Sequence, residues 1–193
     1  MKKKIDTVVW EAQQWSGIEH LLLEQRTNEI IANGAIIMVD HDLPLRIHYI
    51  VRCNPRWAVR QVYIDLPGRA GARQQLNADG TGHWAKTPAR RLASLDGCID
   101  VDIAATPFTN TLPIRRLALQ PGQSAEIKVA YITIPELSFR MERQPYTCLE
   151  AYFEGGRYRY EGLSSGFTAE LTVDGDGLVI DYAEIWRRLW PHL

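Results

Sequence analysis

The sequence predicts a mainly β protein built on one long antiparallel sheet. Short segments in which apolar and polar residues alternate recur along the chain, and turn signals containing Gly, Pro, Asn or Asp separate them. Long runs with a helical period are almost absent. A sheet of this length must curl, close or split into packed layers to cover its edges. The chain has 193 residues and no linker-like stretch, so we expect one domain over residues 1–193.

The N-terminal part of the chain is predicted to form several strands and one tight hairpin. Residues 5–15 are rich in Val, Thr and Trp, and Ser16-Gly17 ends this strand. Residues 18–26 contain the helix formers Leu, Glu and Gln, but the β context favours a strand. Asn33-Gly34 predicts a type I′ hairpin turn, because both residues tolerate positive φ. Further strands are predicted over residues 45–53, 57–66 and 73–76.

The stretch from Ser94 to Leu117 gathers most of the unusual polar residues. Asp100 and Asp102 alternate with apolar neighbours, so both lie on one face of a predicted strand, roughly 7 Å apart. Thr106-Pro107 predicts the start of a helix, since a Thr side chain caps free N–H groups and Pro fits the first turn. We expect Pro113 to end that helix and a second strand to begin there.

The remaining segments continue the β pattern, with two further helical exceptions. We expect one helical turn over residues 88–95 and then strands over residues 125–134, 146–153, 157–162, 167–173 and 178–182. Glu154-Gly155-Gly156 and the turn from Asp174 to Gly177 each predict a hairpin. Asp181, with Glu184 three residues later, predicts a capped short helix over residues 181–190.

The segments LDGCIDVDI and TPFTNTLPIRRL, both from the central stretch, resemble the bacterial family of putative glycolipid-binding proteins, whose function is uncharacterised. The similarity continues in VVWEAQQWSGIEHL, IHYIVRCNPRWAVR, QPYTCLEAYFEGGRYRYEG and GFTAELTVDGDGLVIDY. The resemblance implies a spiral β-roll, in which a long curled sheet wraps around one helix, and it implies a homodimer. Either the central stretch or residues 181–190 supplies the wrapped helix. Asn54 departs from the family pattern, which has an acidic residue near this position.

The composition of the chain bears on its binding partners and on its cellular compartment. A net charge of −1 with 23% charged residues leaves no basic field for nucleic acid. The three cysteines are far apart and form no C-x-x-C pair, which favours reduced thiols and a cytoplasmic location. No apolar run approaches the length of a transmembrane segment.

The candidate ligand-binding residues form two groups. Asp100 and Asp102 could accept hydrogen bonds from sugar hydroxyls while Arg115 and Arg116 hold an anionic group, or all four could form an internal salt-bridge network. Thr109, Asn110 and two tryptophans complete the set. Trp57 and Trp84 could line a pocket, although core packing is the commoner role of a tryptophan.

We expect no metal and no cofactor. Three consecutive residues, Asp40-His41-Asp42, cannot all converge on one ion. The segment from Asp174 begins like a calcium loop, but Ile185 stands where the final glutamate is required. No P-loop, dinucleotide fingerprint or nucleophile signature is present in the sequence.

Three functions remain open. The first is a cytoplasmic β-roll that binds an amphiphile, such as a glycolipid, in an apolar groove; the lipid part rests on the resemblance. The second is a carbohydrate-directed enzyme that uses Asp100 or Asp102 as a general acid or base. The third is a non-catalytic homodimeric scaffold. We favour a binding protein over an enzyme.

Overall fold

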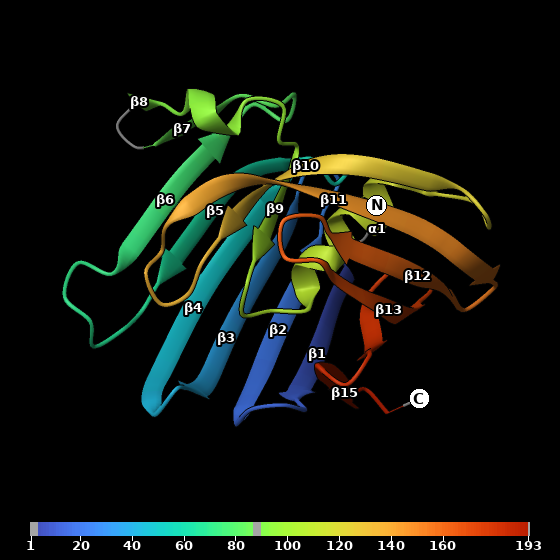
Figure 1. The fold of residues 1–193 in the computed structure, drawn as a ribbon, viewed down its shortest axis with the longest axis horizontal. Helices are drawn as coiled ribbons and strands as arrows, with labels where there is room; N and C mark the ends of the chain where they lie inside the picture. Colours follow the sequence, from blue (N-terminus) through green and yellow to red (C-terminus); the bar gives the residue numbers. More distant parts are fainter. Residues whose placement is uncertain (1–3, 87–89, 193) are drawn as a thin grey trace.

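The computed structural model describes residues 4–86 and 90–192. Within these residues one large, curled, unclosed sheet contains fifteen strands, which confirms the mainly β class and the predicted β-roll (Figure 1). The strands are β1 (Lys4–Ala12), β2 (Gly17–Gln25), β3 (Ile30–Asp40), β4 (Leu43–Cys53), β5 (Val59–Asp65), β6 (Arg73–Ala78), β7 (Trp84–Lys86), β8 (Arg90–Arg91), β9 (Asp100–Ile103), β10 (Ser124–Ile132), β11 (Phe139–Tyr152), β12 (Gly155–Gly162), β13 (Phe167–Asp174), β14 (Val179–Tyr182) and β15 (Trp186–Trp190).

The first and last strands of the chain are neighbours in the middle of the sheet. The two edge strands, β8 and β9, come from the middle of the chain. From one edge to the other, the strands follow the order β8 down to β1 and then β15 down to β9. Strands β1 and β15 pair antiparallel where the two halves join. Strand β9 lies at one edge and pairs with β10 in parallel. The Val59 N–H donates to the Ile99 carbonyl, so the chain just before β9 touches β5. Figure 1 shows β10 and β11 arching across the strands β2–β4.

The wrapped helix comes from the central stretch. A 3₁₀ turn, η2 (Phe108–Asn110), leads into α1 (Thr111–Leu117), and Phe108 and Leu112 are fully buried. The Thr106 hydroxyl accepts a hydrogen bond from the Phe108 N–H, as the predicted cap requires. The expectation that Pro113 ends the helix is wrong. Pro113 occupies the first turn of α1, where a missing N–H breaks no intrahelical hydrogen bond, and the helix continues to Leu117.

The predicted hairpin at Asn33-Gly34 is also wrong, because both residues lie inside the continuous strand β3. Gly34 pairs with Tyr49 of β4. A Cβ atom at Gly34 would overlap the Tyr49 ring, so glycine is required here to make room for an aromatic side chain and not to turn the chain. Asn33 faces His48, whose Nε2 lies 2.8 Å from the Asn33 Oδ1.

The helix predicted over residues 181–190 is a strand pair, β14 and β15. Trp186 is buried opposite Ala12 of β1, while Arg187, the next residue, is exposed opposite Glu11. This alternation has the period of a strand, and pairing with β1 outweighs the capping signal. The Trp10 indole N–H donates to the Val179 carbonyl and ties the two ends of the chain together.

Most of the other predicted elements are present with shifted bounds. Strand β11 begins at Phe139, well before the predicted Tyr146, and both predicted C-terminal hairpins form. The helical turn expected over residues 88–95 is a short strand, β8, followed by a 3₁₀ turn, η1 (Ala93–Leu95); residues 87–89 lie outside the described residues. In the described part of the chain no helix has the length and hydropathy needed to cross a bilayer.

Candidate functional site

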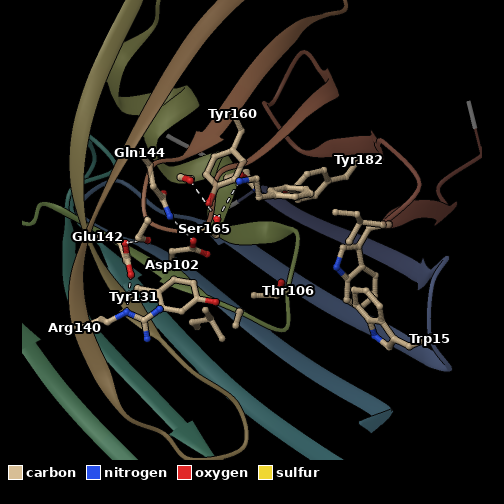
Figure 2. A pocket seen from close by; sticks show the side chains of 18 residues that line it. Trp15, Asp102, Thr106, Tyr131, Arg140, Glu142, Gln144, Tyr160, Ser165 and Tyr182 are labelled. Atoms are coloured by element: carbon tan, nitrogen blue, oxygen red, sulfur yellow. Dashed lines mark hydrogen bonds and ion pairs between the residues drawn. The ribbon is translucent and has the colours of Figure 1, made fainter. Parts of the chain in front are cut away.

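A cavity of about 360 Å³ opens at the inner face of the roll (Figure 2). This volume lies at the lower end of the range for small-molecule sites, roughly 300–1,000 Å³. Aromatic side chains form much of its wall, and they come from five strands between β10 and β15 and from the turn between β1 and β2. They are Trp15, Tyr131, Tyr160, Phe167, Tyr182 and Trp186. We call this space the Asp102 cavity, because the carboxyl group of Asp102 is part of its wall.

The Asp102 carboxyl group accepts two hydrogen bonds from neutral donors. Gln144 Nε2 donates to Oδ2 over 2.6 Å, and the Thr109 hydroxyl donates to Oδ1 over 3.1 Å. Burial raises the pKa of Asp102, the two hydrogen bonds oppose this rise, and the negative charge of Glu142 adds to it. Asp102 is therefore a carboxyl group beside a cavity that keeps its proton to a higher pH than an ordinary aspartate.

A second carboxyl group, Glu142, lines the same cavity in a different environment. Arg140 Nε donates to Glu142 over 2.6 Å, and the Ser164 hydroxyl donates to the other oxygen. Burial raises the pKa of Glu142, but these two hydrogen bonds and the charge of Arg140 outweigh it, so the pKa lies below its usual value. The Arg140 guanidinium also stacks on Tyr131, 4.7 Å from the ring centroid.

Asn110 joins the cavity wall to the aromatic core. The Tyr146 hydroxyl donates to Asn110 Oδ1 over 2.8 Å, and the Asn110 amide donates to the Pro107 carbonyl. Gln144 Oε1 is buried and has no hydrogen-bond donor among the described residues. Hydrogen bonds therefore hold the amide groups of the wall in place, and one acceptor, Gln144 Oε1, still lacks a donor among the described residues.

The predicted constellation separates into two parts. Asp102 lines the cavity, whereas Asp100 is fully buried and forms a bidentate ion pair with Arg116, at 2.6 to 3.2 Å. Burial raises the pKa of Asp100, and the paired guanidinium opposes that rise. This pair has the geometry of the internal salt bridge that was one of the two interpretations of the sequence.

Three further candidates lie away from the Asp102 cavity. Arg115 donates to the Gly175 carbonyl and stacks on Trp57, 5.5 Å from the ring centroid. Trp57 and Trp84 are buried in the core, and the Trp84 indole donates to the Cys98 carbonyl. Asn54 Oδ1 accepts hydrogen bonds from two backbone N–H groups beside Trp57, so an amide oxygen performs the role that a carboxylate could have in this loop.

Sequence reasoning missed the residues that β11 contributes. Arg140, Glu142 and Gln144 precede the predicted start of that strand at Tyr146, so their alternation was not recognised. The available signal was period two: Glu142 and Gln144 are buried, and Arg143 between them is exposed. The tyrosines of the wall carry no local signal, because β10, β12 and β14 bring them together from distant positions.

A buried acid on β2 was also missed. Glu19 is fully buried on the inward face that Leu21 and Leu23 share, and the Tyr49 hydroxyl donates to its Oε1 over 2.5 Å. Burial raises the pKa of Glu19 to about 7, although the hydroxyl groups of Thr106 and Tyr49 oppose the shift. A charged residue at an inward position of a predicted strand was the sign that could have revealed it.

The described residues contain no group of three or more His, Cys, Asp or Glu side chains placed to hold a metal ion. The Asp102 cavity instead offers aromatic faces together with carboxyl, amide and hydroxyl groups. Such a set can pack against the apolar faces of a sugar ring and hydrogen-bond its hydroxyl groups.

Comparisons with known proteins found one family model and one solved structure that match the chain. A family model described as "Putative glycolipid-binding" matches residues 7–188. The chain is 40% identical to a protein of the DUF1089 family from Pseudomonas aeruginosa whose crystal structure is known; the match covers 90% of this chain and 92% of that chain, with a TM-score of 0.80. No curated protein is significantly similar to the chain.

Proposed function

Because the chain belongs to the family described as putative glycolipid-binding, we propose that it binds an amphiphile whose uncharged, sugar-like head group occupies the Asp102 cavity. The observation that supports this proposal is that the Asp102 carboxyl group and several aromatic rings line the same cavity. Asp102 has two neutral hydrogen-bond donors, and no Lys or Arg nitrogen lies in salt-bridge distance of it among the described residues.

The charges of the cavity favour an uncharged head group over a phosphate. Asp102 and Glu142 are the acids of the wall and Arg140 is its base, already hydrogen-bonded to Glu142. A phosphate would meet two carboxyl groups and one occupied guanidinium, which is unfavourable. A polyol can donate its hydroxyl hydrogens to Asp102 and to the unsatisfied Gln144 Oε1.

Native mass spectrometry of the protein purified from its natural host tests the proposal. We expect a bound amphiphile in about one copy per chain, which organic extraction releases for identification. Asp102→Asn should lose it. Asp42→Asn is the matched control, because Asp42 is exposed in the β3–β4 turn at a positive φ that Asn tolerates. A folded, empty parent protein that also leaves added glycolipid unbound would contradict the proposal.

The second candidate function is a glycoside hydrolase that uses the two acids of the cavity. The observation that favours it is that the pKa values of the two groups shift in opposite directions. The pKa of Asp102 is raised and that of Glu142 is lowered, as expected of a general acid and its ionised partner. Asp100, the other acid considered from the sequence, is bound to Arg116 and does not line the cavity. Hydrolysis of p-nitrophenyl glycosides that disappears in both Asp102→Asn and Glu142→Gln would favour this function.

We further propose one domain over residues 1–193, a homodimer and a cytoplasmic location. One continuous sheet supports the single domain, and three buried free thiols suit a reducing compartment. Ile18 and Ile37 form an exposed cross-strand pair on the outer face, with Leu22 nearby on β2, which supplies apolar surface for a second copy. Light scattering tests the dimer: Ile37→Glu should yield monomers, and an unchanged mass would contradict this contact.

A further inference from the structure

A second cavity, of about 430 Å³, adjoins the Asp102 cavity. Trp15 and Ala104 line both cavities, and Ala104 is exposed at their common rim. Trp15 lies between β1 and β2, and Ala104 directly follows β9. A ligand can therefore extend from one cavity into the other past these two residues.

The second cavity has fewer charged side chains in its wall than the Asp102 cavity. Besides the two shared residues, its wall contains Met38, Val39, Ala105 and Ile134. Its polar residues, Gln14, Asp40 and His41, belong to the ends and turns of strands. We call this space the apolar groove. Its wall has one acid, Asp40, and no Lys or Arg among the described residues, whereas the wall of the Asp102 cavity has two acids and a guanidinium. An alkyl chain would therefore meet fewer charged groups in the second cavity than in the first.

Trp15 marks the boundary between them. Its ring contacts Trp186 edge to face, with centroids 5.6 Å apart. Its indole N–H is buried and has no hydrogen-bond acceptor among the described residues. An unsatisfied buried donor is unfavourable, and an oxygen atom that joins a polar head to an alkyl chain would supply the acceptor at this boundary.

We infer that the apolar groove holds the alkyl chain of a single-chain amphiphile, an alkyl glycoside or a close chemical relative, with the linking oxygen at Trp15. This inference rests on the proposed function, which places the uncharged head group in the Asp102 cavity. It adds where the chain lies and predicts how affinity depends on chain length.

Isothermal titration with alkyl β-glucosides and β-galactosides, from methyl to decyl and below their micelle concentrations, tests the inference. Burial of each methylene should tighten binding about 4-fold until the groove is filled. Met38→Asn places an amide in the groove and should flatten this dependence. Met141→Asn is the matched control, because it makes the same substitution on β11 at a residue that is 38% exposed and lines neither cavity.

Two further variants distinguish effects on the apolar groove from effects on the Asp102 cavity. Ile134→Ser changes the groove from the loop after β10, away from β3, so it gives a second reading if Met38→Asn folds poorly. Asp102→Asn should weaken binding by the same factor at every chain length. The slope of affinity against chain length should then stay that of the parent.

Each outcome decides between the two proposals. Equal affinity for the methyl and decyl glycosides would overturn the inference and leave the proposed function standing. A chain-length dependence that persists in both Met38→Asn and Ile134→Ser would overturn the placement of the chain in this groove. Failure of every glycoside to bind would contradict the proposed function itself. A chain-length dependence lost in both groove variants and kept in Met141→Asn supports the inference.

Discussion

Gln144 and Asp102 come from strands β11 and β9, and a hydrogen bond of 2.6 Å joins the amide of the first to the carboxyl group of the second. Strand β9 is an edge of the sheet and pairs only with β10 among the described strands. This side-chain contact therefore connects the edge strand to the next strand but one. The same contact holds the acceptor oxygens of Asp102 at the cavity wall.

Asp102→Asn should destabilise the protein by about 1–3 kcal/mol, because two amide groups would then face each other and one donor would lose its acceptor. The exchange Asp102→Asn with Gln144→Glu restores one donor and one acceptor, so we expect it to recover at least half of that loss. Urea denaturation measures both. Strictly additive effects of the two substitutions would mean that the pair is not coupled.

Arg116→Ala should be the most damaging of the arginine substitutions, at about 3–5 kcal/mol, because it leaves the fully buried Asp100 without its partner. Arg115→Ala is the matched control on the same helix. It removes a contact with a carbonyl group and a cation–π contact, so we expect a loss of about 1 kcal/mol. Thermal unfolding compares the two, and equal losses would argue against the buried ion pair.

Glu19 should make stability depend on pH. Its folded pKa of about 7 lies above the ordinary value of 4.5, so the protonated side chain stabilises the fold below pH 4.5 and this contribution is lost as the pH rises to about 7. The loss over this interval is about 3 kcal/mol, and Glu19→Gln should remove it. Urea denaturation at pH 5 and pH 8 measures the difference. If the parent and the variant change in parallel, Glu19 does not titrate in this range.

Gly34→Ala should cost about 1–3 kcal/mol, because its Cβ atom would overlap the Tyr49 ring and the surrounding strands must move apart. The cost should shrink when Tyr49 is first replaced by Leu, which occupies less of that space. A double-mutant cycle by chemical denaturation measures the coupling. An unchanged cost in the Tyr49→Leu background would show that the overlap with the ring is not its origin.

The fold class could be predicted from the sequence because strand alternation and turn chemistry are local signals. Several strands and both C-terminal hairpins follow from them. The failures also have local explanations. Asn33-Gly34 has the composition of a turn, but its conformation is decided by Tyr49 on the next strand, and Asp181 with Glu184 has a capping pattern that pairing with β1 overrides.

The candidate site was less accessible to sequence reasoning. Asp102, Thr109 and Asn110 were found because they cluster in the chain, and the structure brings them together. The separation of Asp100 from Asp102 could not be foreseen, since two residues on one strand face reach different partners only after α1 and β11 have packed around them. The aromatic wall depends on pairing between strands remote in sequence.

The position of the chain ends within the sheet has a consequence for how the chain could be rearranged. Reading the sheet from β9 through β15 and then from β1 to β8 gives the strands in unbroken sequential order. A circular permutant that joins the present ends by a linker and opens between β8 and β9 would therefore pair each strand with its neighbour in sequence. Its contact order would be lower at the same final structure, so we expect it to fold faster than the parent.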